Sequence, residues 1–520
     1  MIDWMGSLQI LAVPLLLTVS MLVLVFADLL LPAAAQPKGN QGPLSFRDLR
    51  KAQAEPVPGV QRADILGWIA LVQLALCLAA SFVAPPGVLP GGSYVHDAMA
   101  VLMERVLLVA GILAILGAFG HVRQSFARRQ GEFYALLQCS LVGMTLLAGT
   151  RDLLLLVVAF ELMGIPLYVL ATFAKTDKNA AGDATPGRKS AEAGMKFYLV
   201  GALSSAITLY GVSLLYGLSG STHIADLARI PSSPLLQVAS ALVVAGFGFK
   251  LGLAPFQFWI PDTYEGAPTP VVSFFSVAPK IAGLLALTQI LLGGLLGHLQ
   301  LWLPGLVGMS VVTMTAGNLL ALPQLHLKRL LANSGVAQMG TMLIGVFAAA
   351  TLGAKGHGLS ALLFYFIAYL AANTGLFLVI ETLAHDGSEP SERDLIASLS
   401  GLNRRSPGLA LAALVCLLSL AGIPFAVGFW AKLYVFLAAW EAGYAWLVLV
   451  AVGVSVIGLF YYLRVARSMY LGEPRVTTPV RSPLTLSVAV TACALATAGL
   501  GLYPSVIVEA TRTAAAAWLH

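Results

Sequence analysis

Charged residues are scarce in this chain of 520 residues: Asp, Glu, Lys and Arg make up 10% of it, whereas 58% is hydrophobic. So few charges cannot cover an ordinary water-exposed surface, which excludes a soluble globular protein. The formal net charge of +6 does not indicate nucleic acid, because membrane proteins collect Lys and Arg in their cytoplasmic loops. We therefore expect a polytopic protein in the lipid bilayer, with no nucleic-acid partner.

Cysteine is also rare, and its spacing excludes several kinds of site. Four cysteines lie singly in apolar runs: Cys77, Cys139, Cys416 and Cys493. Without a C-x-x-C spacing they predict neither a disulfide framework nor a cysteine metal site. None of the eight histidines falls in the middle of an apolar run, and no G-x-G-x-x-G stands between a strand and a helix. We expect no redox cofactor and no metal in this chain.

Long apolar runs are what the sequence has in abundance. About 20 such residues cross roughly 30 Å of hydrocarbon. The expected spans, fourteen in number, are 7–32, 63–84, 98–119, 133–150, 152–174, 190–218, 235–260, 270–297, 301–323, 330–353, 357–384, 408–440, 443–470 and 483–507. With this count the loops rich in Lys and Arg all fall on one side, which is cytoplasmic by the positive-inside rule. Both termini are then expected in the periplasm.

Five charged side chains lie inside these spans: Glu161, Lys196, Lys250, Lys280 and Lys432. A charge at the centre of a membrane helix costs about 2.5 to 3.5 kcal/mol, so each needs a reason, of which ion movement is one. The alternatives are structural. Lys196 lies close to a basic loop, where its stem could reach the interface, and the other charges could form buried ion pairs. Glu104 and Glu381 lie near span ends, where solvated or capping roles are expected.

Two spans carry Gly and Pro beside a lysine, which predicts interrupted helices. They read KLGLAPFQFW from Lys250 and LAGIPFAVGFWAK up to Lys432. Broken helices survive at membrane depth only where the freed backbone groups meet protein or water. Similar breaks in two halves indicate an inverted repeat with polar sites near the midplane. A carboxylate about 4 Å from such a lysine interacts by roughly 4 kcal/mol, about three pKa units, enough to switch its charge.

Several segments carry a family resemblance. They are FELMGIPLY at 160–168, MKFYLVGA at 195–202, PDTYEGAPTP at 261–270, VAPK at 277–280, GNLLAL at 317–322, LKRL at 327–330 and LSLAGIP at 418–424. Over roughly residues 130 to 470 the chain resembles the antiporter-like membrane subunits of respiratory complex I, and their N branch in particular. The resemblance implies an all-α membrane fold with two inverted five-helix repeats, 131–297 and 298–470, in which helices 7 and 12 are discontinuous. A three-helix segment over 1–130 and a last helix within 471–520 flank them.

The resemblance also implies a function and roles for single residues. It implies a proton-translocating subunit of NADH:quinone oxidoreductase, moving protons from cytoplasm to periplasm and driven by quinone reduction elsewhere. Glu161 and Lys250 would be the coupling pair. Lys280 would be the central lysine and Lys432 the terminal one, while Lys196 matches a further family lysine. Sibling M subunits usually carry glutamate at the position of Lys432.

Two glutamines depart from the pattern of many relatives, which have histidine at these positions. Gln257 and Gln338 can hold water but cannot titrate near neutral pH. Other subunits are expected to hold FMN, iron–sulfur clusters and quinone, and the expected partners are the antiporter-like subunit M and the small K, J, A and H type subunits in a bacterial inner membrane. A cation/proton antiporter subunit of the Mrp type and a non-pumping scaffold stay open as alternatives.

Overall fold

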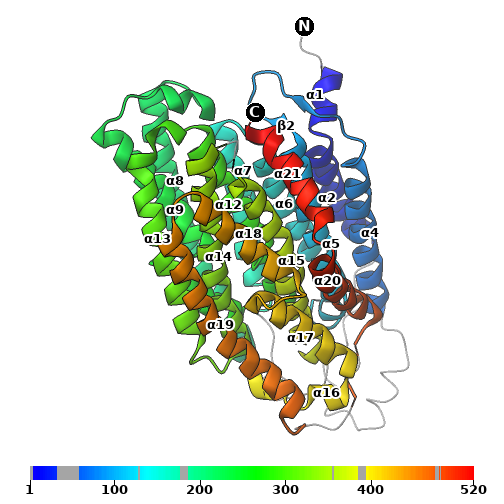
Figure 1. The fold of residues 1–520 in the computed structure, drawn as a ribbon. Helices are drawn as coiled ribbons and strands as arrows, with labels where there is room; N and C mark the ends of the chain where they lie inside the picture. The colour runs from blue at the N-terminus through cyan, green and yellow to red at the C-terminus, as the bar shows by residue number, and fades with distance from the viewer. Residues whose placement is uncertain are drawn as a thin grey trace.

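The chain is almost entirely helical, as expected for apolar runs that must satisfy their own backbone hydrogen bonds in lipid. The computed structural model describes residues 4–31, 58–126, 129–175, 185–353, 356–384, 394–474, 479–480 and 482–519. A two-stranded hairpin, β1 (Gly87–Val88) paired antiparallel with β2 (Val95–His96), connects two of the helices. Figure 1 shows the helices side by side in one bundle.

The helices follow one another with short connections. In the first half they are α1 Trp4–Ile10, α2 Ala12–Leu30, α4 Pro58–Ala80, α5 Ala98–Ser125, α6 Gln130–Gly149, α7 Leu153–Ala171, α8 Thr185–Ser219, α9 Pro234–Leu251, α10 Trp259–Gly266, α11 Thr269–Phe275 and α12 Ala278–Gly293. In the second half they are α13 Leu299–Ala321, α14 Leu327–Leu352, α15 Gly358–Ala384, α16 Leu402–Arg405, α17 Pro407–Ala421, α18 Val427–Glu441, α19 Ala445–Leu471, α20 Leu484–Leu502 and α21 Ser505–Leu519.

The fourteen predicted spans are confirmed as apolar helices. Among the described residues, 12 helical segments are long and apolar enough to cross a membrane, and two shorter apolar helices, 64–80 and Pro407–Ala421, complete the set. The sequence analysis did not predict α21, which follows Pro504 and packs against α5 and α15. In Figure 1, α1 and α21 lie at the same end of the bundle, as an even number of crossings requires.

Both predicted helix breaks are present, each at a glycine with positive φ. Gly252 ends α9 with φ 69°, and Gly422 ends α17 with φ 85°. This left-handed conformation favours glycine because it has no Cβ. A third break, which the sequence analysis missed, separates α11 from α12 and puts Lys280 in the first turn of α12. The two predicted breaks fit an inverted repeat, while the boundaries 131–297 and 298–470 stay a prediction.

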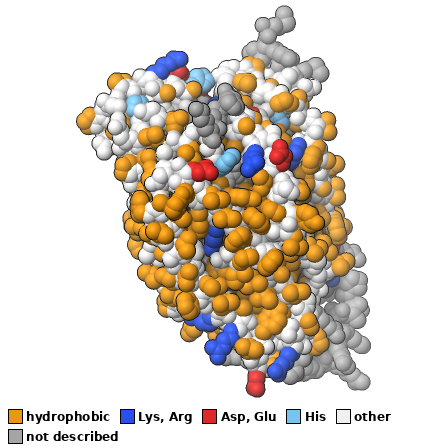
Figure 2. Space-filling view, in the orientation of Figure 1, with side chains coloured by type: hydrophobic (Ala, Val, Ile, Leu, Met, Phe, Trp, Pro, Cys, Tyr) orange, Lys and Arg blue, Asp and Glu red, His pale blue; other side chains and the backbone are white. Residues whose placement is uncertain are grey.

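The centre of the bundle is formed by α11, α12, α14 and α15, whose residues are almost all buried, whereas α2, α8, α19 and α20 are mostly exposed. Figure 2 shows hydrophobic side chains covering the middle of one face, with most acidic and basic side chains gathered toward its two ends. Such a belt is the surface that a protein presents to hydrocarbon or to another membrane subunit. Charges that lie inside the bundle are therefore the candidates for function.

Candidate functional site

Glu161 and Lys250 lie next to each other, from α7 and the last turn of α9. The Lys250 Nζ is 3.7 Å from the Glu161 Oε1, donates a hydrogen bond to the Phe160 carbonyl at 3.2 Å, and stands 3.9 Å from the centre of the Phe160 ring. Gly164 makes room for it, since an added Cβ would lie 2.6 Å from the Nζ. The partner that Glu161 requires from another span is thus Lys250.

The two members of this pair differ in exposure. The Lys250 side chain is 6% exposed and the Glu161 side chain is 30% exposed. Glu161 lies on the same face of α7 as the exposed Val158 and Ile165, and it also accepts a hydrogen bond from Ser205 of α8. The carboxylate therefore has a second partner and open space on its outer side, so that it can separate from a lysine that cannot follow.

Lys280 is buried at the centre of the bundle with a relative exposure of 2%, and its Nζ has no hydrogen-bond partner within the described parts of the chain. The Nζ is 5.4 Å from the centre of the Tyr264 ring. Gly335 of α14 separates it from Tyr369, because an added Cβ there would lie 3.1 Å from the Nζ and 2.9 Å from the Tyr369 hydroxyl. The amine thus faces aromatic rings and a hydroxyl, with no acid beside it.

Several other buried polar atoms on the helices around Lys280 lack a protein partner in the described residues. They are the Thr263 and Ser273 hydroxyls, the Tyr264 hydroxyl and the Asn373 Oδ1. Buried polar groups are almost always hydrogen-bonded, and ordered water is the partner that completes such sets. The surroundings of Lys280 therefore have the polar lining of a hydrated region.

Gln338 of α14 connects this central region to Lys432. Its Oε1 accepts a hydrogen bond from the Tyr365 hydroxyl at 2.5 Å, and its Nε2 donates to the Leu420 carbonyl at 3.0 Å. The Nε2 is also 3.3 Å from the Tyr462 hydroxyl, which is hydrogen-bonded to Ser334. The side chain is thereby fixed between α15, α19 and the end of α17.

Lys432 lies in the second turn of α18 and reaches back across the break in its span. Its Nζ donates to the Ala421 carbonyl at 3.0 Å, one residue beyond the carbonyl that Gln338 contacts. Gly422 lets the chain pass, since an added Cβ would lie 2.8 Å from the Lys432 Cδ. Gln338 and Lys432 thus meet at the same helix end, which their separation by 94 positions in the sequence does not reveal.

Gln257 does not join this line. It is buried in the connection between α9 and α10, and its Oε1 has no hydrogen-bond partner among the described residues. Its main-chain carbonyl accepts a hydrogen bond from Ile260 at 3.1 Å. The structure therefore places Gln257 beside the helix break that follows Lys250, with no direct contact to Lys280.

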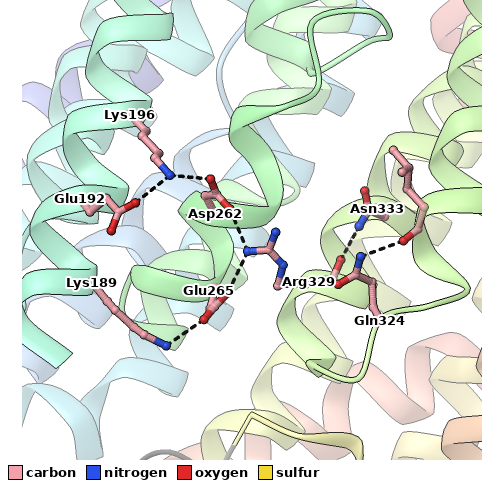
Figure 3. Close-up of polar contacts among 9 residues, drawn as sticks. Lys189, Glu192, Lys196, Asp262, Glu265, Gln324, Arg329 and Asn333 are labelled. Atoms are coloured by element: carbon pink, nitrogen blue, oxygen red, sulfur yellow. Dashed lines mark hydrogen bonds and ion pairs between the residues drawn. The ribbon is translucent and has the colours of Figure 1, made fainter. Parts of the chain in front are cut away.

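Lys196 also lies apart from the buried line. The side chain is 40% exposed, and its Nζ pairs with Glu192 at 2.7 Å and with Asp262 at 2.6 Å. Asp262 and Glu265 of α10 both accept from Arg329 at 2.8 Å, and Lys189 pairs with Glu265 at 2.9 Å. Figure 3 shows this ionic cluster joining α8, α10 and α14. The structure thus favours for Lys196 a role in holding α10 in place.

Removing the carboxylate at the centre of this cluster gives the first prediction. Asp262→Ala leaves Lys196 and Arg329 each without one partner, so we expect a loss of about 1 to 2 kcal/mol, since half-exposed pairs contribute up to about 1 kcal/mol each. The midpoint of thermal unfolding of the purified assembly measures it. Asp64→Ala is the control, because Asp64 pairs only with the exposed Arg123 at 3.5 Å. Equal midpoints for both variants would contradict the prediction.

Glu104 and Glu381 are not solvated, contrary to the sequence analysis. Both are fully buried, and each faces a histidine. Glu104 accepts a hydrogen bond from the Tyr94 hydroxyl at 2.8 Å and lies 3.3 Å from the His96 Nε2. Burial alone would lower the pKa of His96, but its hydrogen bond to Glu104 and that charge outweigh burial and raise it above the usual value. Neither partner could be inferred from the spacing of the residues.

Residues 150–458 match the family model described as NADH:quinone oxidoreductase/Mrp antiporter, TM. The NADH-quinone oxidoreductase subunit N of Moorella thermoacetica is 39% identical over 457 residues, which cover 86% of this chain and 91% of that one. That of Heliobacterium modesticaldum is 40% identical over 426 residues, covering 81% and 86%. The chain belongs to the subunit N family of NADH-quinone oxidoreductases. The predicted resemblance to the N branch is confirmed.

Solved structures support the same family and fold. A chain of respiratory complex I from Thermus thermophilus with bound aureothin is 31% identical, with a TM-score of 0.76, and the match covers 96% of this chain and 98% of that one. A chain of the Mrp complex from Dietzia sp. DQ12-45-1b has a TM-score of 0.80 at 24% identity, over 99% and 97% of the two chains. The second likeness shows the fold alone. This subunit N family member is thus an antiporter-like membrane subunit.

Proposed function

We propose that this subunit translocates protons from the cytoplasm to the periplasm, within the membrane arm of an NADH:quinone oxidoreductase in a bacterial inner membrane. The observation that carries the proposal is the line of buried amines and polar groups through the bundle, from Glu161 and Lys250 past Lys280 and Gln338 to Lys432. Buried charges at bilayer depth are expensive, and a line of them is typical of an ion path.

The first step assigned to this path is a switch at the Glu161–Lys250 pair. At about 4 Å and an effective dielectric of 20, the attraction is worth roughly 4 kcal/mol, about three pKa units. When the carboxylate turns toward Ser205, the lysine loses that attraction and releases a proton. Moving one proton against 100 mV takes about 2.3 kcal/mol. The switch is therefore large enough to do the work.

The later steps run through Lys280, Gln338 and Lys432. Lys280 has no carboxylate beside it to fix its charge, so it can accept a proton and pass it on. Gln338 cannot titrate, but it orients the Tyr365 hydroxyl and lies one carbonyl from the Lys432 contact. Lys432 is the last amine and releases protons toward the periplasm. Lys196 and Gln257 support α10 and the break before it.

Quinone reduction in other subunits drives the path in this proposal. FMN, iron–sulfur clusters and quinone are assigned to those subunits, and no cofactor to this chain. The partners are the antiporter-like subunit M and the small K, J, A and H type subunits, with both termini in the periplasm. The apolar belt of Figure 2 gives such subunits and lipid a surface to contact.

A cation/proton antiporter subunit of the Mrp type is the second candidate, and the fold likeness to the Mrp complex favours it. Purification in mild detergent, followed by identification of the bound subunits, separates the two. Subunits that carry flavin and iron–sulfur clusters are expected to copurify, whereas small antiporter subunits would favour the second candidate. A non-pumping scaffold would instead tolerate loss of any buried lysine.

Lys280→Met tests the path directly. The apolar side chain fits the buried site but cannot carry a proton, so we expect normal assembly with fewer protons moved per electron. Proton uptake by membrane vesicles oxidising NADH measures this ratio. The control is Lys189→Met, because Lys189 is 52% exposed and lies off the path. An unchanged ratio in Lys280→Met would leave the scaffold as the better proposal.

A further inference from the structure

The path described above leaves two buried acid–histidine pairs unused. One is Glu104 with His96, and the other is Glu381 with His121. Glu104 and His121 both belong to α5 and are seventeen residues apart, about 25 Å along the helix axis. The two pairs therefore lie near opposite ends of the bundle, each buried and each able to hold a proton. This symmetry makes one of them a control for the other.

The Glu381 pair connects the interior to the surface. The Glu381 Oε1 is 3.2 Å from the His121 Nδ1, the glutamate side chain is 1% exposed, and that of the histidine is 20% exposed. The other ring nitrogen, Nε2, makes no hydrogen bond to any residue that the structure describes. Both residues lie near the ends of their helices on the side that the positive-inside rule makes cytoplasmic. One imidazole ring thus stands between the buried carboxylate and that side.

A stripe of polar residues runs from Glu381 along one face of α15. The positions 365, 369, 373, 377 and 381 repeat every four residues, so their side chains share a face. On this face Asn373 donates to the Ser276 hydroxyl at 2.9 Å, and the Tyr369 hydroxyl contacts the Ser276 carbonyl at 3.3 Å. Ser276 directly precedes the turn into α12, and Tyr369 borders Gly335 beside Lys280. The stripe therefore leads from Glu381 to the central lysine.

A single apolar side chain interrupts the stripe. Phe377 packs against Tyr264 with ring centres 5.9 Å apart, and the Lys280 Nζ is 5.4 Å from the centre of the same Tyr264 ring. The Tyr264 hydroxyl is buried without a partner in the described residues. Tyr264 thus touches both sides of the interruption and offers a polar atom there. Because the interruption is one residue long, a water held at this hydroxyl would bridge it.

We propose that Glu381, together with His121, takes up from the cytoplasmic side the protons that reach Lys280. The proposal rests on the proposed function and names the entry of the same path. In this step a proton passes from water through the imidazole to the carboxylate, and the resulting carboxylic acid returns it to the polar stripe and the Lys280 amine. Glu381 is then negative before uptake and negative again after release.

A purely structural clamp between α5 and α15 is the competing explanation for the buried pair. It predicts that Glu381→Gln is harmless to pumping once the assembly has formed, because the amide oxygen still accepts a hydrogen bond from the ring. Uptake requires a group that titrates, so the same variant removes the proton carrier. Glu381→Asp keeps a carboxylate and restores part of the uptake. The pair of variants therefore separates titration from packing.

The test compares Glu381→Gln, Glu381→Asp and the control Glu104→Gln in assembled complex within membrane vesicles oxidising NADH. We expect Glu381→Gln to lower the number of protons moved per electron to the value of Lys280→Met, Glu381→Asp to regain part of it, and Glu104→Gln to leave it unchanged. If Glu381→Gln does not assemble, His121→Gln carries the same expectation, since that side chain is partly exposed.

Each other outcome decides against the entry. If Lys280→Met loses pumping while Glu381→Gln pumps normally, the proposed function stands and the entry lies elsewhere. If both variants pump normally, the proposed function itself fails. An equal loss in Glu104→Gln would mean that any buried acid on α5 or α15 matters structurally, and failure of both Glu381→Gln and His121→Gln to assemble would assign the pair to packing.

Discussion

Lys250→Ala is expected to reduce proton movement through this subunit to background while the complex still assembles. The variant removes the amine that faces Glu161 at 3.7 Å and with it an interaction of roughly 4 kcal/mol, a factor of about a thousand in the balance between the charged and neutral amine. The carboxylate retains its hydrogen bond from Ser205, so it is not left without a partner. Protons per electron in NADH-oxidising vesicles provide the measurement.

Lys250→Arg distinguishes loss of charge from loss of titration. The guanidinium keeps a positive charge beside Glu161 but does not release its proton at any accessible pH. We therefore expect assembly at the wild-type level and pumping as low as in Lys250→Ala. Normal stoichiometry in either variant would remove Glu161 and Lys250 from the mechanism, and recovery in Lys250→Arg alone would make the pair a structural one.

Gly143→Ala is expected to have the largest effect on assembly. Gly143 lies where α6 and α7 approach most closely, and an added Cβ would be 2.3 Å from the Met163 backbone nitrogen and 2.6 Å from the Ala159 carbonyl. Because these are backbone atoms, the helices must separate, at a cost of about 1 to 3 kcal/mol. The amount of assembled complex and its thermal unfolding midpoint should both fall.

Gly308→Ala is the matched control for this variant. Gly308 is also inside a membrane helix, α13, but nothing lies within 4 Å of an added Cβ. Alanine favours the helix over glycine by about 1 kcal/mol, so stability should stay the same or rise slightly. Should Gly143→Ala assemble as well as Gly308→Ala, the close approach of α6 and α7 would contribute little to stability.

The sequence predicted the elements well but not every break between them. Apolar length determines the spans because lipid leaves few alternatives to a helix, and the Gly-Pro patterns beside Lys250 and Lys432 predicted where two of them end. The break before Lys280 was missed, because the residues around Ser276 are as apolar as their neighbours. The helix α21 was missed because the predicted last span ran past Pro504.

The site was predicted only where local composition determines it. A charge within an apolar run is visible in the sequence, so Glu161, Lys250, Lys280 and Lys432 could be named as candidates. Their neighbours could not, since Gln338 meets the Leu420 carbonyl and Glu381 meets His121 across long stretches of chain. Whether Lys196 is inside or outside depended on Asp262, which also comes from another helix.

The helix breaks have an electrical consequence for the three buried amines. Lys250 lies in the last turn of α9, and Lys432 donates to a carbonyl in the last turn of α17, so both are near the negative ends of helix dipoles. Lys280 lies in the first turn of α12, near a positive end. The backbone thus holds cations at the two outer stations and repels them from the middle one, and a proton on Lys280 is in transit rather than stored.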